Sequence, residues 1–218
     1  MFCNKKQPML VDLTHLLKDN VTVYPGTPAP AFPSLCTLEQ DGFAERSISI
    51  TTHTGTHMDA PCHILPDTRS LDEFPLDKFI GKGVVVDCTR TSSISLSLLQ
   101  SKEAQIREAD FVLFYTGWQD KWNTPHYFDP FPTLTAEATK WLLHLQPKAL
   151  GFDVISVDSM TDEHLPNHHL LLQNEILIIE NLTNLDKLLN KSFQLYCLPL
   201  LIAASDASPV RAFARITG

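Results

Sequence analysis

The sequence has no long apolar run and no paired cysteines. Its longest apolar stretches, such as residues 176–179 between two glutamates, are far shorter than the roughly 20 residues that a membrane-spanning helix needs. Its five cysteines are scattered, and no Cys-x-x-Cys pair occurs, which argues against a disulfide framework and favours a reducing compartment. The first residues lack the apolar core of a signal peptide. We therefore expect a cytoplasmic protein with no membrane partner.

Basic residues are also scarce. The chain carries 17 Lys and Arg against 25 Asp and Glu, a formal net charge of −8, and shows no basic stripe. Binding to phosphate backbones depends on clustered Lys and Arg, so this composition excludes a general nucleic-acid-binding protein. No Gly-x-Ser-x-Gly sequence occurs, which leaves serine-hydrolase chemistry with little support. Cys62 directly precedes His63, a spacing that favours a small buried side chain over an activated nucleophile.

The remaining composition is that of a folded α/β protein. With 44% hydrophobic and 19% charged residues, the 218-residue chain can bury a core without disulfides, and no linker divides it, so we expect one domain over residues 1–218. Short apolar runs predict buried strands, and longer periodic segments predict helices. The expected strands are 84–87, 111–115, 149–153 and 176–179, and the expected helices are 95–109 and 135–145. This alternation indicates a mixed sheet.

The first part of the chain has a different character. Residues 20–50 are rich in proline and are followed by a run of β-forming residues. Proline interrupts regular structure, so we expect loops and antiparallel strands there. In the helical segment 135–145, Thr135 is the expected N-cap.

Three histidines and an aspartate gather in one short stretch. Residues 50–63 read ITTHTGTHMDAPCH and contain His53, His57, Asp59 and His63. Imidazole and carboxylate together suit Zn²⁺, Mn²⁺ or Fe²⁺. The preceding β-branched run and Gly55 oppose a helix, so we expect extended or looped backbone. In a strand, His57 and Asp59 share one face because the side-chain period is two.

His53 must fold back toward the other two residues if all three bind one ion. Four residues of extended strand span roughly 13 Å, whereas ligand atoms of one ion lie within a few Å because each bond is about 2 Å long. The chain must therefore curl between His53 and His57, and Gly55 is the residue that permits it. A lone histidine would indicate an ordinary surface or core residue, but this clustering around a glycine turn predicts a metal site.

A second candidate pair lies later in the chain. Pro166 and Asn167 can open a helix, with Asn167 as N-cap and His168 in the first turn. Glu180 closes the apolar run 176–179, and a carboxylate there is costly to bury unless it is paired or bound to a metal. From the residues alone, an exposed His168 and a solvated Glu180 are the simpler interpretation.

Residues 53–63, HTGTHMDAPCH, resemble the HxGTHxDxPxH signature of the cyclase family of metal-dependent hydrolases. That family includes kynurenine formamidase and isatin hydrolase. Further similarities extend through almost the whole chain. They are VDLT at 11–14, YPG at 24–26, TGW at 116–118, GFD at 151–153, SVD at 156–158, HHLLL at 168–172, ENL at 180–182 and DASPVR at 206–211, where Ala207 replaces a frequent glycine.

The resemblance implies an α/β fold of the swivelling β/β/α type, with a mixed, partly antiparallel sheet and flanking helices, assembled as a homodimer or homotetramer. It assigns His53, His57 and Asp59 to a first metal ion. It also implies that Asp59 bridges to a second ion, which His168 and Glu180 complete. The implied cofactor is one or two Zn²⁺ ions, with Mn²⁺ as the alternative.

His63 matches a histidine proposed for acid–base work in the family. A metal ion and an acid–base histidine together predict hydrolysis of an amide in a small-molecule substrate. The resemblance implies N-formyl-L-kynurenine as that substrate, giving L-kynurenine and formate. The alternatives are a cyclic amide or lactone, a cyclisation or dehydration, or a non-catalytic metal-binding protein. Mixed His, Asp and Glu ligands favour an open catalytic site over a closed structural one.

Overall fold

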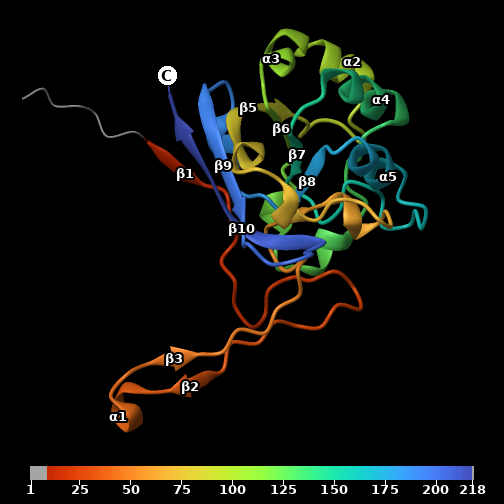
Figure 1. The fold of residues 1–218 in the computed structure, drawn as a ribbon. Helices are drawn as coiled ribbons and strands as arrows, with labels where there is room; N and C mark the ends of the chain where they lie inside the picture. The colour runs from red at the N-terminus through yellow and green to blue at the C-terminus, as the bar shows by residue number, and fades with distance from the viewer. Residues whose placement is uncertain (1–8, 218) are drawn as a thin grey trace, which may run out of the picture.

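The computed structural model describes residues 9–217, which fold around one large mixed sheet (Figure 1). The strand order is β1-β10-β4-β8-β7-β6-β5-β9, and β9 also pairs with β10, so seven of these strands close on themselves like a barrel. The strands are β1 (Leu10–Asp12), β4 (His57–Asp59), β5 (Ile80–Asp87), β6 (Phe111–Tyr115), β7 (Ala149–Phe152), β8 (Leu177–Glu180), β9 (Phe193–Pro199) and β10 (Ala207–Ile216). The α/β class with a mixed sheet is thus confirmed.

The parallel part of the sheet runs from β5 through β6 and β7 to β8, and the remaining pairs are antiparallel. All four expected buried strands lie here, because a strand covered on both faces reads as an uninterrupted apolar run. Along β6, Val112 and Phe114 pack toward the helices, while Phe111 and Leu113 belong to the core on the other face. The sheet therefore separates two apolar cores.

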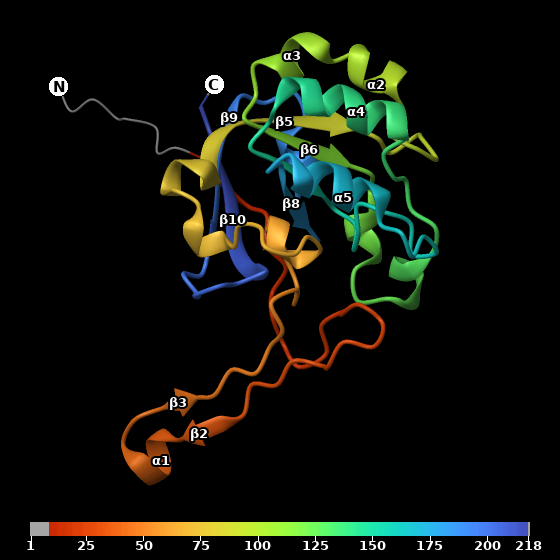
Figure 2. The same ribbon diagram turned by 45° about the vertical axis from the view of Figure 1, so that its right-hand side comes forward.

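Helices α2 (Leu96–Gln100), α3 (Glu103–Arg107), α4 (Ala136–Leu145) and α5 (Pro166–Gln173) cover one face of the parallel strands (Figure 2). Thr135 caps α4 as predicted, since its hydroxyl accepts the backbone N–H of Ala138 at 3.3 Å. The single helix expected over 95–109 is wrong, because the chain breaks at Ser101. The Ser101 hydroxyl donates to the carbonyl of Leu98 at 2.6 Å and so competes with the helical backbone pattern.

Residues 30–50 form an arm that projects away from the body (Figures 1 and 2). The arm holds β2 (Ser34–Cys36) and β3 (Glu45–Arg46), which pair in antiparallel fashion, with the single-turn helix α1 (Leu38–Asp41) at its tip. This confirms the expected loops and antiparallel strands of the proline-rich stretch. None of the helices within residues 9–217 has the length and apolar character needed to cross a membrane.

His15 gives the fold a pH-dependent contact. Its ring stacks on Trp122 with centroids 4.2 Å apart, and its buried Nε2 has no hydrogen-bond partner. Burial lowers the pKa of His15 to about 4, from an ordinary value of 6.5. Between these values the unfolded chain binds a proton that the folded chain does not, so the free energy of unfolding falls as the pH drops from 6.5 toward 4.

We expect His15→Phe, which keeps a ring against Trp122, to lose less stability than the unaltered protein between pH 7 and pH 5. Urea unfolding at both pH values, with a chelator present throughout, measures this difference. An equal loss in the two proteins would show that His15 titrates normally in the folded state.

Candidate metal centre

Strand β4 and the turn before it position the first three candidate ligands. His57 and Asp59 lie on β4, where His57 Nε2 is 3.4 Å from Asp59 Oδ1. Gly55 has φ = +70°, and a Cβ there would lie 2.5 Å from the Leu17 side chain, so this turn requires glycine. The turn brings His53 back until its Nδ1 is 3.0 Å from Asp59 Oδ1. The predicted curl between His53 and His57 is therefore confirmed.

The Gly55 turn is held in place by Asn181, the residue that directly follows β8. Asn181 donates its side-chain amide to the carbonyl of Gly55 at 2.8 Å, and its own backbone carbonyl accepts the Thr56 hydroxyl at 2.6 Å. The Tyr127 hydroxyl in turn donates to the Asn181 side chain at 2.8 Å. These bonds tie the His53–Asp59 segment to the carboxyl end of β8.

Helix α5 and strand β8 supply the second pair. His168 lies in the first turn of α5, and its Nε2 is 3.4 Å from Oε1 of Glu180, the last residue of β8. The prediction of Asn167 as N-cap is wrong, because α5 begins at Pro166 and Leu165 occupies the N-cap position. The carboxylate of Asp158 accepts the backbone N–H groups of Asn167 and His168, both at 2.9 Å. Asn167 is instead buried within the helix and accepts the Thr139 hydroxyl at 2.6 Å.

The structure thus brings the five candidate ligands to one place, at the carboxyl ends of β7 and β8. They form two groups that share Asp59, and within each group one potential ligand atom per residue lies within 4.8 Å of the others. The groups are His53, His57 and Asp59, and Asp59, His168 and Glu180. A third group of the same kind joins His53, His63 and Asp206, so geometry alone does not separate the predicted acid–base role of His63 from a ligand role.

The donor atoms fit a divalent cation. Asp59 is only 1% exposed, and its Oδ1 contacts the rings of His53 and His57, at 3.0 and 3.4 Å. Asp59 Oδ2 and the buried Nε2 of His57 form no hydrogen bond with any described residue. Leaving a buried polar atom without a hydrogen bond costs about 1–3 kcal/mol, and a bound cation would satisfy these atoms. Nitrogen and carboxylate oxygen ligands of this kind suit Zn²⁺ or Mn²⁺.

In each of the three candidate histidine ligands, the ring nitrogen that faces away from the other ligands lies at hydrogen-bond distance from an oxygen atom. Such partners fix the ring orientation and direct the other nitrogen toward the metal. The pairs are His53 Nε2 with Asp206 Oδ2 at 3.0 Å, His57 Nδ1 with the Gly55 carbonyl at 2.8 Å, and His168 Nδ1 with Asp158 Oδ2 at 2.8 Å. Reasoning from the sequence did not assign Asp158 and Asp206 to the site, although both lie in segments that resemble the family.

The electrostatics of the site favour positive charge. Burial alone would lower the pKa of His168, but hydrogen bonds to Asp158 and Glu180 raise it to about 10. Burial opposes charge on His53 as well, and the carboxylates of Asp59 and Asp206 raise its pKa to about 9. The carboxylates around these rings thus outweigh desolvation and would attract a divalent cation.

His63 lies beside these groups at the end of the short 3₁₀ helix Pro61–His63. Its ring centroid is 4.2 Å from that of His53, and its Nδ1 is 3.6 Å from Asp206 Oδ2. Burial lowers the pKa of His63, which keeps the neutral form available near neutral pH. The adjacent Cys62 is half-buried and burial raises the pKa of its thiol, so it suits packing better than nucleophilic attack.

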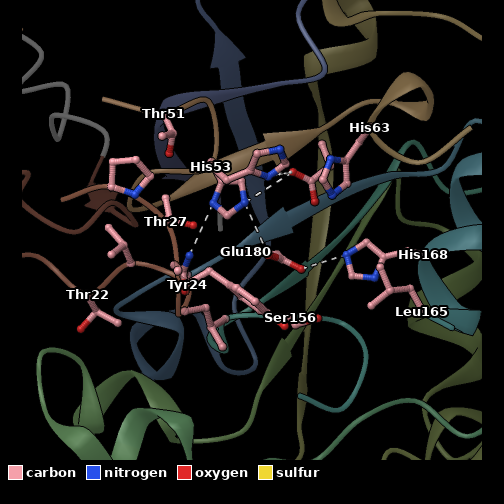
Figure 3. A pocket seen from close by; sticks show the side chains of 17 residues that line it. Thr22, Tyr24, Thr27, Thr51, His53, His63, Ser156, Leu165, His168 and Glu180 are labelled. Atoms are coloured by element: carbon pink, nitrogen blue, oxygen red, sulfur yellow. Dashed lines mark hydrogen bonds and ion pairs between the residues drawn. The ribbon is translucent and has the colours of Figure 1, made fainter. Parts of the chain in front are cut away.

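A cavity of about 500 Å³ opens onto the cluster. Figure 3 shows His53, His63, His168 and Glu180 pointing toward one another, with Thr22 and Thr27 on the side away from His168. Tyr24, Ile155 and Leu165 add apolar surface to the lining. This volume suits a small molecule. No Lys or Arg is found among the described residues that line the cavity.

Asp206 gives a first test of the centre. We expect Asp206→Asn to weaken metal binding about 10- to 100-fold, because the amide cannot supply the charge that holds the His53 ring. Competition against a chelator of known affinity measures this, and Asp77→Asn, the same change at an exposed carboxylate, is the control. Unaltered affinity in Asp206→Asn would show that His53 needs no support from this carboxylate.

Known proteins that are similar to this chain include metal-dependent hydrolases, in agreement with the candidate metal centre. Kynurenine formamidase from Bacillus cytotoxicus is 31% identical over 206 residues, which cover 94% of this chain and 96% of the relative. An isatin hydrolase bound to the product analogue thioisatinate superimposes with a TM-score of 0.87 and 26% identity, covering 96% of this chain and 92% of that one. A "predicted metal-dependent hydrolase" from Bacillus stearothermophilus has a TM-score of 0.79 and 25% identity, covering 95% and 98%.

Residues 11–159, more than half of the chain, match the family described as "Putative cyclase". The match includes the His53–His63 stretch that builds the first half of the centre, and the relatives extend the similarity over the second half. The chain therefore belongs to this cyclase family.

Proposed function

We propose that this protein hydrolyses N-formyl-L-kynurenine to L-kynurenine and formate at a centre of one or two Zn²⁺ ions. Family membership supports metal-dependent hydrolysis of an amide. The identity of the substrate is the part that we propose. The observation that carries it is the convergence of buried potential metal-ligand atoms beside His63 in a cavity of small-molecule size, in a chain 31% identical to a kynurenine formamidase.

The roles of the residues follow from their places. His53, His57 and Asp59 would hold one ion, and Asp59, His168 and Glu180 a second. When bound, such ions polarise a carbonyl and make water acidic enough to react near pH 7. The new C–O bond forms between water and the formyl carbon, the water gives up a proton, and the C–N bond breaks. The leaving aniline nitrogen takes up a proton.

His63 is placed to accept the proton that the attacking water gives up and to pass it to the leaving nitrogen. Neither of its ring nitrogens has a hydrogen bond of normal length to another described side chain, and His63 lines the cavity. A positioned imidazole of this kind contributes roughly 10²- to 10⁴-fold to a rate. Tyr24 lines the same cavity and offers an aromatic face to the aryl ring of the substrate.

The test is hydrolysis of N-formyl-L-kynurenine by the purified protein, followed by the absorbance of kynurenine. We expect turnover that stops with a chelator and returns with added Zn²⁺. Adding Mn²⁺ instead distinguishes the two candidate metals. No turnover by protein shown to contain its metal would overturn the choice of substrate.

A cyclic amide such as isatin is the second candidate substrate, and one observation favours it. N-formylkynurenine carries a carboxylate, whereas the described cavity lining offers no Lys or Arg to pair with it. Isatin needs no such partner. Parallel assays on both compounds decide between them, since one preformed pocket should prefer one shape by a wide margin in kcat/KM. We further propose a cytoplasmic location, because scattered cysteines without a disulfide suit a reducing compartment.

A further inference from the structure

Tyr127 is a fully buried tyrosine that the proposed chemistry does not use. It lies on the short 3₁₀ helix Pro125–Phe128. Its hydroxyl has two oxygen atoms within reach, Asn181 Oδ1 at 2.8 Å and the Asp153 carbonyl at 3.2 Å. A single O–H can donate one strong hydrogen bond, so the shorter contact with Asn181 is the main one. Burial raises the pKa of Tyr127 well above its usual value, so the hydroxyl keeps its proton at neutral pH.

The Tyr127 ring is held in one place by its neighbours. It meets the Trp122 ring edge to face, with centroids 5.0 Å apart and planes at 90°. The Tyr127 carbonyl accepts the indole N–H of Trp118 at 3.1 Å, and its backbone N–H donates to the Thr124 carbonyl at 3.1 Å. With backbone and ring both fixed, the hydroxyl has a defined position from which to orient Asn181.

The side chain of Asn181 has only one orientation that satisfies both of its partners. Its Nδ2 lies 2.8 Å from the Gly55 carbonyl, and a carbonyl oxygen can only accept a hydrogen bond. The amide must therefore present N–H to Gly55, which leaves Oδ1 to accept the Tyr127 hydroxyl. Asn181 is itself buried, so each of these bonds would be costly to lose.

The Gly55 carbonyl is also the atom that orients His57. It lies 2.8 Å from His57 Nδ1, and because a carbonyl accepts, the ring proton is placed on Nδ1. The other nitrogen, Nε2, is then left with a free lone pair. It lies 3.4 Å from Asp59 Oδ1 and 3.4 Å from Glu180 Oε2, among the candidate ligand atoms. The position of one carbonyl thus decides where the His57 lone pair points.

We propose that Tyr127 is a positioning residue for the metal centre, which acts by orienting the Asn181 amide and thereby the Gly55 carbonyl and the His57 ring. This inference rests on the metal centre of the proposed function. Among the described residues, the Tyr127 hydroxyl bonds to no candidate ligand, so its effect on the metal must pass through Asn181.

The test is Tyr127→Phe, which keeps the ring against Trp122 and removes only the hydroxyl. We expect Zn²⁺ affinity, measured by competition against a chelator, to fall about 10-fold, the lower end of the range for groups that support ligating histidines. The visible absorption bands of the Co²⁺-substituted protein should change as well, because they report ligand geometry. Tyr196→Phe is the matched control. It removes a hydroxyl that donates to Gln194 on β9 at 3.1 Å and should match the unaltered protein in both measurements.

A double-mutant cycle tests the route through Asn181. Asn181→Gly removes the amide and tolerates the left-handed backbone at this position, where φ is +57°. By itself it should weaken Zn²⁺ binding at least about 10-fold, which keeps the inference open to refutation if Tyr127→Phe does not fold. In the Asn181→Gly protein, the further change Tyr127→Phe should have little additional effect on Zn²⁺ affinity, because the group through which Tyr127 acts is already gone.

Unchanged Zn²⁺ affinity and Co²⁺ bands in Tyr127→Phe would overturn the inference. Effects of the two substitutions that simply add would also overturn it, since they would show that Tyr127 does not act through Asn181. If the unaltered protein binds no Zn²⁺ or Co²⁺, the metal centre of the proposed function is wrong, and this inference is wrong with it. Neither measurement uses a substrate, so a wrong choice of substrate would leave both results unchanged.

Discussion

Replacing Asp59 with alanine is expected to remove metal binding at both ligand groups and to reduce kcat/KM at least about 10³-fold, which corresponds to about 4 kcal/mol. Asp59 is the one residue that the two groups share, and its carboxylate is buried between the rings of His53 and His57. Losing it leaves the two imidazole rings of His53 and His57 on one side and His168 with Glu180 on the other. Neither remnant supplies the three protein ligands of a catalytic zinc site.

Metal content after dialysis measures the first effect directly. A second measurement is the melting temperature with and without added Zn²⁺, because an ion that binds only the folded chain raises it. That rise should vanish in Asp59→Ala and persist in Asp77→Ala, which removes an exposed carboxylate that belongs to none of the ligand groups. Full activity in an Asp59→Ala protein without metal would refute the entire mechanism.

The parallel strands were predictable because burial on both faces leaves uninterrupted apolar runs such as FVLFY in β6. The closure of the sheet was not, since it depends on β10 pairing with β4 near one end and with β9 along most of its length. The pairing of β10 with β4 joins segments more than a hundred residues apart, whereas β9 and β10 are neighbours in the chain. Local patterns carry no information about such pairings.

The two errors in the helices have a common origin. Ser101 ends a helix within a segment of helical composition, and the carboxylate of Asp158 accepts backbone N–H groups at the start of α5, where Asn167 was the expected N-cap. In both cases a side-chain hydrogen bond decides the local backbone, and its energy of about 1 kcal/mol exceeds the differences in helix propensity on which the predictions rested. Asp158 lies nine residues before Asn167, in the loop that leads from β7 into α5, and this separation is longer than the spacing of ordinary N-cap patterns.

The candidate site was accessible to sequence reasoning to the extent that its residues are adjacent in the chain. His53, His57 and Asp59 lie within seven residues, and the required curl at Gly55 followed from bond lengths alone. His168 and Glu180 come from other elements, and only the family resemblance linked them to the first three. Asp206 was visible as part of a similar segment, but its bond to His53 depends on the pairing of β10 with β4.

Replacing His63 with asparagine is expected to retain the metal and to lower kcat by about 10²- to 10⁴-fold with little change in KM. The reason is that His63 faces the cavity from outside the two groups that share Asp59, so its loss removes a proton donor and leaves the ligands in place. Asparagine can still form a hydrogen bond but cannot transfer a proton at neutral pH. Steady-state kinetics and metal analysis on the same preparation separate the two effects.

His169→Asn is the matched control, because His169 is an exposed histidine next to a candidate ligand. It should change neither metal content nor kcat. The informative contrary result is loss of metal in His63→Asn. Since His53, His63 and Asp206 also form a group with ligand spacing, that loss would make His63 a ligand and would transfer the proton-donating role to another group at the cavity. Retained metal with a reduced kcat would instead confirm that the catalytic proton passes through His63.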